Sequence, residues 1–174
     1  MVNLGISRSS SEVVCTLDDP MRVLPAGNFG ETFKLAADRL QDKKLGLLAV
    51  GSEACPQAGC LVAVASGGKQ KPNGISAPLL FAKREVWERV GGLRSKAFTL
   101  PLAWLDLSLR AEKDGFSSAL ISSSEILPPA ESAEKLLASS GKKVRETFVK
   151  HWQLNPIPLL PHASELKQPQ TRET

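Results

Sequence analysis

Two stretches decide how this chain folds: residues 80–92 read LFAKREVWERVGG, and residues 105–121 read LDLSLRAEKDGFSSALI. The first predicts a short apolar strand and then an amphipathic helix that stops at Gly91-Gly92, because glycine commonly ends helices. The second predicts a helix with Asp106 and Arg110 one turn apart, a stop at Gly115 and a further strand. Strands that alternate with helices favour an α/β fold built on a layered sheet.

Apolar runs elsewhere in the chain predict more strands and helices. We expect one mixed sheet containing the strands 13–17, 45–50, 60–65 and 79–82. Helices are expected at about 26–41, 101–114, 131–137 and 142–152. In the second of these, Leu102, Leu105 and Leu109 share one stripe and should be buried against the sheet. One domain is expected over residues 1–152, followed by a Pro-rich tail at 153–174 that is extended or disordered.

Composition excludes several classes of protein. The net charge is +4, but basic and acidic residues are interleaved, which favours a mixed solvated surface over a phosphate-binding patch. Because basic and aromatic residues do not alternate, no nucleic-acid partner is expected. No apolar run approaches the roughly 20 residues of a transmembrane helix, so no transmembrane segment is expected.

Cysteine and histidine usage points to no metal centre. Cys15, Cys55 and Cys60 have neither a metal-binding spacing nor a complete set of disulfides. A reducing, cytoplasmic location is expected, and a peripheral position on the inner membrane face stays open. His151 and His162 stand alone, so surface or structural roles are expected for both.

Several motifs, in order, resemble the catalytic domain of family 2 glycosyltransferases, which transfer a sugar from a nucleotide diphosphate to an acceptor. The motifs are the lead-in at 3–14, the strand before Asp18-Asp19, the segments 84–92 and 106–110, and the close at 148–152. The resemblance spans roughly residues 3–152. It implies a truncated nucleotide-diphospho-sugar transferase-like (GT-A) fold, a mixed sheet flanked by helices without the N-terminal units that bind the base and ribose.

The resemblance also implies roles for particular residues. Asp18 and Asp19 would bind the donor diphosphate and a divalent Mn²⁺ or Mg²⁺ ion, which neutralises the leaving group. Gly91, Gly92 and Trp104 would lie at the acceptor loop, and Asp106 is the candidate catalytic residue. The expected partners are a nucleotide sugar and a glycan or lipid acceptor, in polysaccharide, lipid or cell-envelope glycan synthesis.

The chain departs from the family pattern at the catalytic positions. Pro20 stands where the last acid of the metal motif is expected. Ala103-Trp104 stand where the family carries the Glu-Asp pair that supplies its catalytic base. Two interpretations stay open: a hexosyl- or rhamnosyl-transferring enzyme in which Asp106 replaces the base, and a non-catalytic remnant that acts as an interaction module. In the second, Asp106 forms an ion pair with Arg110.

The implied truncation has a structural consequence. The strand Val13–Leu17 would lose its neighbour and lie at a sheet edge. An exposed edge invites pairing, so self-association or a partner chain is expected there.

Overall fold

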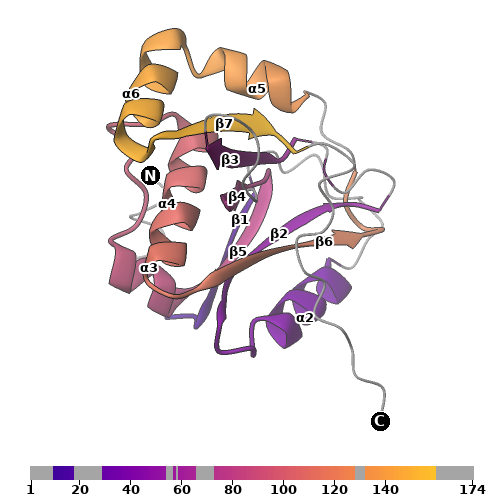
Figure 1. Cartoon of the computed structure of the whole chain (residues 1–174). Helices are drawn as coiled ribbons and strands as arrows, with labels where there is room; N and C mark the ends of the chain where they lie inside the picture. Colours follow the sequence, from indigo (N-terminus) through magenta and orange to yellow (C-terminus); the bar gives the residue numbers. More distant parts are fainter. Residues whose placement is uncertain are drawn as a thin grey trace.

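The computed structural model of the chain describes residues 10–17, 29–53, 57, 59–65, 73–127 and 132–159. Asp18, Asp19 and Pro20 lie outside these residues. The described part is a mixed α/β structure with two sheets flanked by helices (Figure 1). In chain order the elements are β1 (Val13–Leu17), α2 (Gly30–Arg39), β2 (Leu45–Ser52), β3 (Leu61–Ala65), β4 (Asn73–Ser76), β5 (Leu79–Lys83), α3 (Arg84–Val90), α4 (Leu100–Lys113), β6 (Ser117–Ser123), α5 (Ala133–Ser139), α6 (Lys142–Trp152) and β7 (Leu154–Pro158).

The larger sheet has the strand order β1-β5-β2-β6. Strand β5 is antiparallel to both β1 and β2, whereas β2 and β6 are parallel. Strands β1, β2 and β6 therefore run in the same direction, and their carboxyl ends meet at one end of the sheet. In the described part of the chain β1 pairs with β5 alone, so the prediction that Val13–Leu17 lies at a sheet edge is confirmed.

The central strands of this sheet are buried on both faces. Successive side chains of a strand point to opposite faces, and in β2 Leu47 and Ala49 join the core around α4, while Leu48 and Val50 join the core beneath α2. The same alternation places Phe81 of β5 under α2, where its ring lies 5.2 Å from that of Phe33. Burial on both faces explains why these strands read as continuous apolar runs.

The prediction that residues 60–65 belong to the same sheet is wrong. Strand β3 lies in a separate three-stranded antiparallel sheet of order β4-β3-β7. An apolar run shows that a strand is buried, but its pairing partner depends on chain segments far away in sequence. Here the partner is β7, with Val62 opposite Ile157.

Residues Leu154–Pro158, which were predicted to belong to the C-terminal tail, form strand β7. Leu154–Pro158 is extended, as expected, but it is paired along β3 and belongs to the domain. Pro156 and Pro158 are compatible with this pairing because β7 is an edge strand, where a missing N–H group is tolerated.

Helix α4 lies between the two sheets (Figure 1). Its predicted stripe is confirmed, since Leu102, Leu105 and Leu109 have exposed fractions of 0, 0 and 4%. Pro101 lies in its first turn, where a missing N–H group costs nothing. Among the helices of the described residues, none combines the length and apolar character needed to cross a bilayer.

Gly46 in β2 is a point of close approach between three elements. A Cβ atom at this position would lie 2.8 Å from both the Phe116 Cβ and the Val86 Cγ2 atoms. Only glycine lets α3 and the start of β6 pack this closely on β2.

We expect Gly46→Ala to lower the free energy of unfolding by about 1–3 kcal/mol, because the added methyl group overpacks a buried contact. Urea denaturation of the whole chain followed by circular dichroism measures the change. Gly30→Ala, at an exposed helix start, is the control and should change stability by less than about 1 kcal/mol. Equal stability of Gly46→Ala and the parent would contradict this packing.

Candidate functional site

Asp106, the candidate catalytic residue, lies in the middle of α4 with no exposed surface. Its Oδ2 atom accepts a hydrogen bond from Arg110 Nε at 2.9 Å, and the Arg110 Nη2 atom lies at the same distance. Its Oδ1 atom accepts a hydrogen bond from Trp152 Nε1 at 3.0 Å. Both carboxylate oxygens are therefore engaged inside the protein.

Arg110 connects this carboxylate to the loop after α3. It donates to the carbonyl oxygens of Val90 and Gly92, the latter at 2.6 Å. Burial lowers the pKa of Arg110, while the neighbouring Asp106 carboxylate acts in the opposite direction. The guanidinium thus bridges a buried charge and the free carbonyl groups at the end of α3.

The cluster reaches the surface through two basic side chains. Arg94 Nη1 lies 3.6 Å from Asp106 Oδ1 and 3.1 Å from His151 Nε2. The Arg94 side chain is 45% exposed, and His151 is exposed as well. The surface above Asp106 therefore presents the Arg94 guanidinium, a hydrogen-bond donor, beside the His151 ring.

The geometry favours the ion-pair interpretation of Asp106 over the catalytic one. A general base must lie within hydrogen-bond reach of the proton that it removes. Asp106 is buried beneath Arg94, and its oxygens are already hydrogen-bonded. Its position is that of a residue that organises α4, α6 and the loop after α3.

The three predicted acceptor-loop residues occupy different environments. Gly91 is exposed and Gly92 buried, and both adopt the left-handed conformation, with φ of 82° and 71°. Their N–H groups both donate to the Trp87 carbonyl oxygen, which ends α3. Trp104, by contrast, lies in α4 with 1% exposure, and its ring centroid is 5.7 Å from that of Trp87. Trp104 therefore packs in the core against Trp87 of α3 and does not lie in an exposed loop.

Ala103 and Trp104, which stand where the family carries its catalytic Glu-Asp pair, are also buried. Ala103 has no exposed surface, and Trp104 Nε1 is a buried donor without an acceptor among the described residues. Neither side chain can accept a proton, and neither faces solvent.

A second polar cluster, missed by the sequence analysis, lies at the carboxyl ends of β2 and β6. Glu125 Oε2 accepts hydrogen bonds from the Thr32 N–H group at 2.9 Å and from the Thr32 hydroxyl at 2.5 Å. The Ser123 hydroxyl lies 2.6 Å from Thr32 Oγ1, and the Glu53 N–H group donates to the Ser123 carbonyl oxygen. Carboxylates that follow strands are the signal that could have located this cluster.

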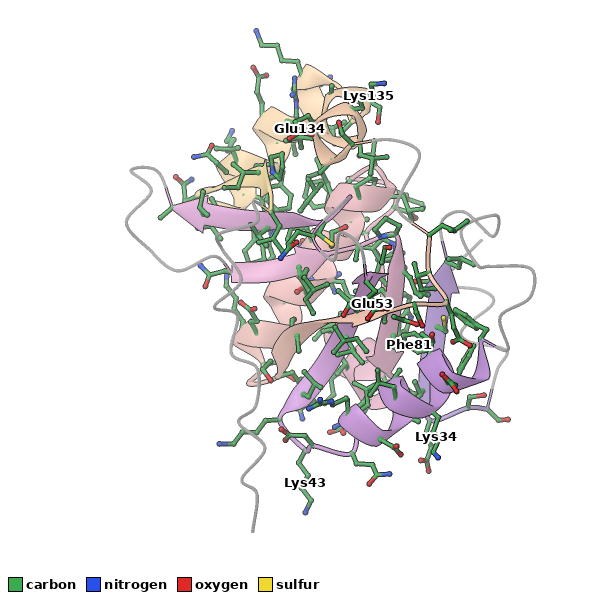
Figure 2. The ribbon with its side chains drawn as sticks, turned by 90° about the vertical axis from the view of Figure 1, so that its right-hand side faces the viewer. Lys34, Lys43, Glu53, Phe81, Glu134 and Lys135 are labelled. Atoms are coloured by element: carbon green, nitrogen blue, oxygen red, sulfur yellow. The ribbon has the colours of Figure 1, made fainter. Side chains whose placement is uncertain are left out.

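This strand-end cluster fixes the start of α2. Glu125 satisfies an N–H group of the first helical turn, and its negative charge suits the positive end of the helix dipole. Glu53 is the exposed carboxylate of the cluster. Glu53 directly follows β2 and is labelled in Figure 2.

The described residues do not by themselves fit a divalent-ion site. Nowhere among them do three His, Cys, Asp or Glu side chains gather as metal ligands. A site at the carboxyl ends of the strands would need Asp18 and Asp19, which lie outside the described residues. Cys15 is not a reactive thiol, because burial raises its pKa to about 12.

Comparisons with protein-family models, curated proteins and solved structures found no match to this chain.

Breaking the buried pair should destabilise the protein strongly. We expect Asp106→Asn to cost about 3–5 kcal/mol of unfolding free energy, because it leaves the Arg110 charge buried without a counter-charge. Replacing both partners, as Asp106→Leu with Arg110→Met, should recover much of this loss. Chemical denaturation of the two variants and the parent measures the effects.

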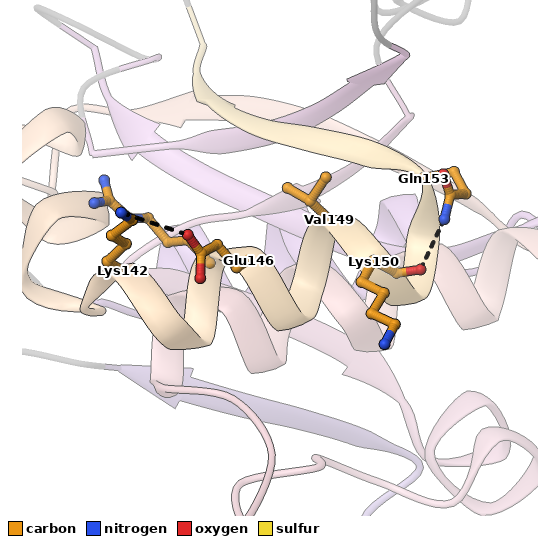
Figure 3. A pocket seen from close by; sticks show the side chains of 6 residues that line it. Lys142, Glu146, Val149, Lys150 and Gln153 are labelled. Atoms are coloured by element: carbon orange, nitrogen blue, oxygen red, sulfur yellow. Dashed lines mark hydrogen bonds and ion pairs between the residues drawn. The ribbon is translucent and has the colours of Figure 1, made fainter.

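The matched control is the Lys142–Glu146 pair on α6, shown in Figure 3. It has the same four-residue spacing, but its side chains are 85% and 65% exposed and 3.8 Å apart. Glu146→Gln should therefore change stability by less than about 1 kcal/mol. If Asp106→Asn had an equally small effect, Asp106 would have no organising role.

Proposed function

We propose that this chain is a glycosyltransferase-like domain that takes part in transferring a sugar from a nucleotide-sugar donor to a glycan, lipid or cell-envelope acceptor. One observation carries the proposal. Three of the motifs on which the resemblance rests, residues 84–92, 106–110 and 148–152, meet in the hydrogen-bonded cluster around Asp106. Segments that are separated in sequence but joined through their motif residues behave as one functional unit.

The direction of the strands in the larger sheet supports this proposal. In open α/β sheets, ligands bind outside the carboxyl ends of the strands. Asp18 and Asp19 directly follow β1, and Glu53 follows β2 at the same end of the sheet. We assign donor-diphosphate and metal binding to these carboxylates and acceptor contacts to the loop at Gly91-Gly92, with Arg94 beside it.

Within the part of the chain that the structure describes, the proposal identifies no catalytic base at the family's position or at Asp106. Ala103 and Trp104 are buried and carry no proton acceptor, and Asp106 is held by Arg110 and Trp152. A positioned base contributes about 10²–10⁴-fold to rate. Binding of the donor with little or no transfer is the activity that this arrangement supports.

We therefore expect negligible turnover of uridine, guanosine or thymidine diphosphate sugars by the isolated chain with Mn²⁺ or Mg²⁺. Metal-dependent binding of a nucleoside diphosphate should remain and should raise the melting temperature. Glu53→Gln should weaken this binding several-fold, because it removes a carboxylate from the metal end of the sheet. Product analysis and thermal shift measure the two quantities.

Glu134→Gln, on the exposed side of α5, is the matched control and should bind like the parent. Absence of any nucleoside diphosphate binding would count against the whole proposal. Robust turnover that is lost in a folded Asp106→Asn variant would instead show that Asp106 is the base.

A second candidate function is an interaction module, and the edge strand β1 favours it. Among the described residues β1 has a neighbour on one side only. Val13, Cys15 and Leu17 pack towards the core beneath α2, so the strand is held in an extended form that could accept another strand. Pairing along such an edge is a common route of association between chains.

If β1 is an association edge, the chain should form dimers at high concentration, and Thr16→Lys should shift it towards monomer, because charged side chains on edge strands oppose pairing. Size-exclusion chromatography with light scattering gives the molar mass. Thr147→Lys, the same substitution at an exposed site on α6, is the control. A monomer at every concentration would rule this function out for the isolated chain.

A further inference from the structure

A cationic pocket lies at the opposite end of the four-stranded sheet from the strand-end cluster. It is a cavity of about 400 Å³ between three segments: the turn before β2, the end of β5 with α3, and the turn after α4. Strand β2 spans eight residues between the two ends, about 25 Å at the usual rise per residue. The pocket is therefore separate from the ligand end proposed above. Figure 2 labels Lys43, which lines it.

Basic side chains outnumber acidic ones in this pocket. It is lined by Lys43, Lys44, Lys83, Glu85, Arg89 and Asp114, among others. Both carboxylates are engaged by Arg89, whose Nε atom lies 2.7 Å from Asp114 Oδ2 and whose Nη1 atom lies 3.3 Å from Glu85 Oε1. Within the described residues, no carboxylate forms an ion pair with any of the three lysines.

Two of the four cationic groups are held in place by the fold. The Lys83 ammonium donates to the Asp42 carbonyl oxygen at 2.6 Å. The Arg89 guanidinium lies over the Phe116 ring, 4.9 Å from its centroid. The backbone of Lys44 is fixed on both sides, since its N–H group donates to Asp42 Oδ1 and its carbonyl oxygen accepts from the Ser117 N–H group. The Lys83 and Arg89 charges are therefore already positioned and lose little entropy when a ligand binds.

We propose that this pocket binds a small polyanion that carries adjacent phosphate groups. Like charges gathered in one cavity repel each other, and a bound anion removes that repulsion. Phosphate oxygens accept several charge-assisted hydrogen bonds at once, which matches three ammonium groups beside one guanidinium. The volume is within the range of small-ligand sites and exceeds what a single phosphate needs. The proposal does not depend on the sugar-transfer function.

Inorganic pyrophosphate is the probe, titrated into the whole chain at constant ionic strength and followed by thermal shift and calorimetry. The expected result is a saturable rise in melting temperature, larger than that with inorganic phosphate at equal concentration. The double variant Lys44→Gln, Lys83→Gln should bind pyrophosphate at least tenfold more weakly. Circular dichroism shows whether this double variant is folded. A second double variant, Lys44→Arg with Lys83→Gln, keeps the charge at position 44 and should recover binding.

Two controls separate this pocket from general charge effects. Lys34→Gln removes one exposed lysine on α2, labelled in Figure 2, and should leave binding unchanged. Lys142→Gln with Lys150→Gln removes the same charge as the pocket variant from the surface of α6 in Figure 3, and binding should again remain. Loss of binding in the α6 variant with retention in the pocket variant would overturn the proposal. So would a non-saturable response, or one matched by sodium chloride at equal ionic strength.

Discussion

The buried Asp106–Arg110 pair is the interaction on which the rest of this structure depends. It joins α4 to the end of α3 through the Gly92 carbonyl and to α6 through Trp152. Directly after Trp152 the chain turns at Gln153, with φ of 57°, and enters β7. One buried carboxylate thus helps to set where the second sheet receives its edge strand. A buried charged group needs several hydrogen-bond and ion-pair partners, because burying it unpaired would cost several kcal/mol of folding free energy.

The second constraint is the position of α4 between the sheets. A helix buried on nearly all sides is apolar all round, and most of α4 is apolar. Its polar residues Asp106, Ser108 and Arg110 are hydrogen-bonded within the fold. The Ser108 hydroxyl forms hydrogen bonds to both sheets. It accepts from the Ile75 N–H group of β4 and lies 3.0 Å from the Ser118 hydroxyl of β6. Helix α4 therefore joins the two sheets through hydrogen bonds as well as through packing.

The ionisable groups divide by location. The buried carboxylates, Asp106 and Glu125, are hydrogen-bonded inside the fold, where they fix helix positions. The exposed surface above Asp106 and the cationic pocket at the end of the four-stranded sheet are lined mainly by basic groups. This division favours functions that bind anionic or polar ligands over functions that need a carboxylate base at these places. It also explains how a chain with mixed charges can present locally cationic surfaces.

The sequence by itself determined most of the helices and strands. Glycine stops, apolar runs and the leucine stripe of α4 located nearly every helix and strand, because periodicity and caps are local properties. The four-residue spacing of Asp106 and Arg110 made their ion pair one of the two interpretations that the sequence left open, and the structure shows this pair. Only the tertiary structure decided that β3 leaves the main sheet for β7, that Trp152 meets Asp106, that Glu125 meets Thr32, and that cations from three segments line one pocket. These contacts join residues far apart in sequence, and no local pattern records which distant segment fills a given face.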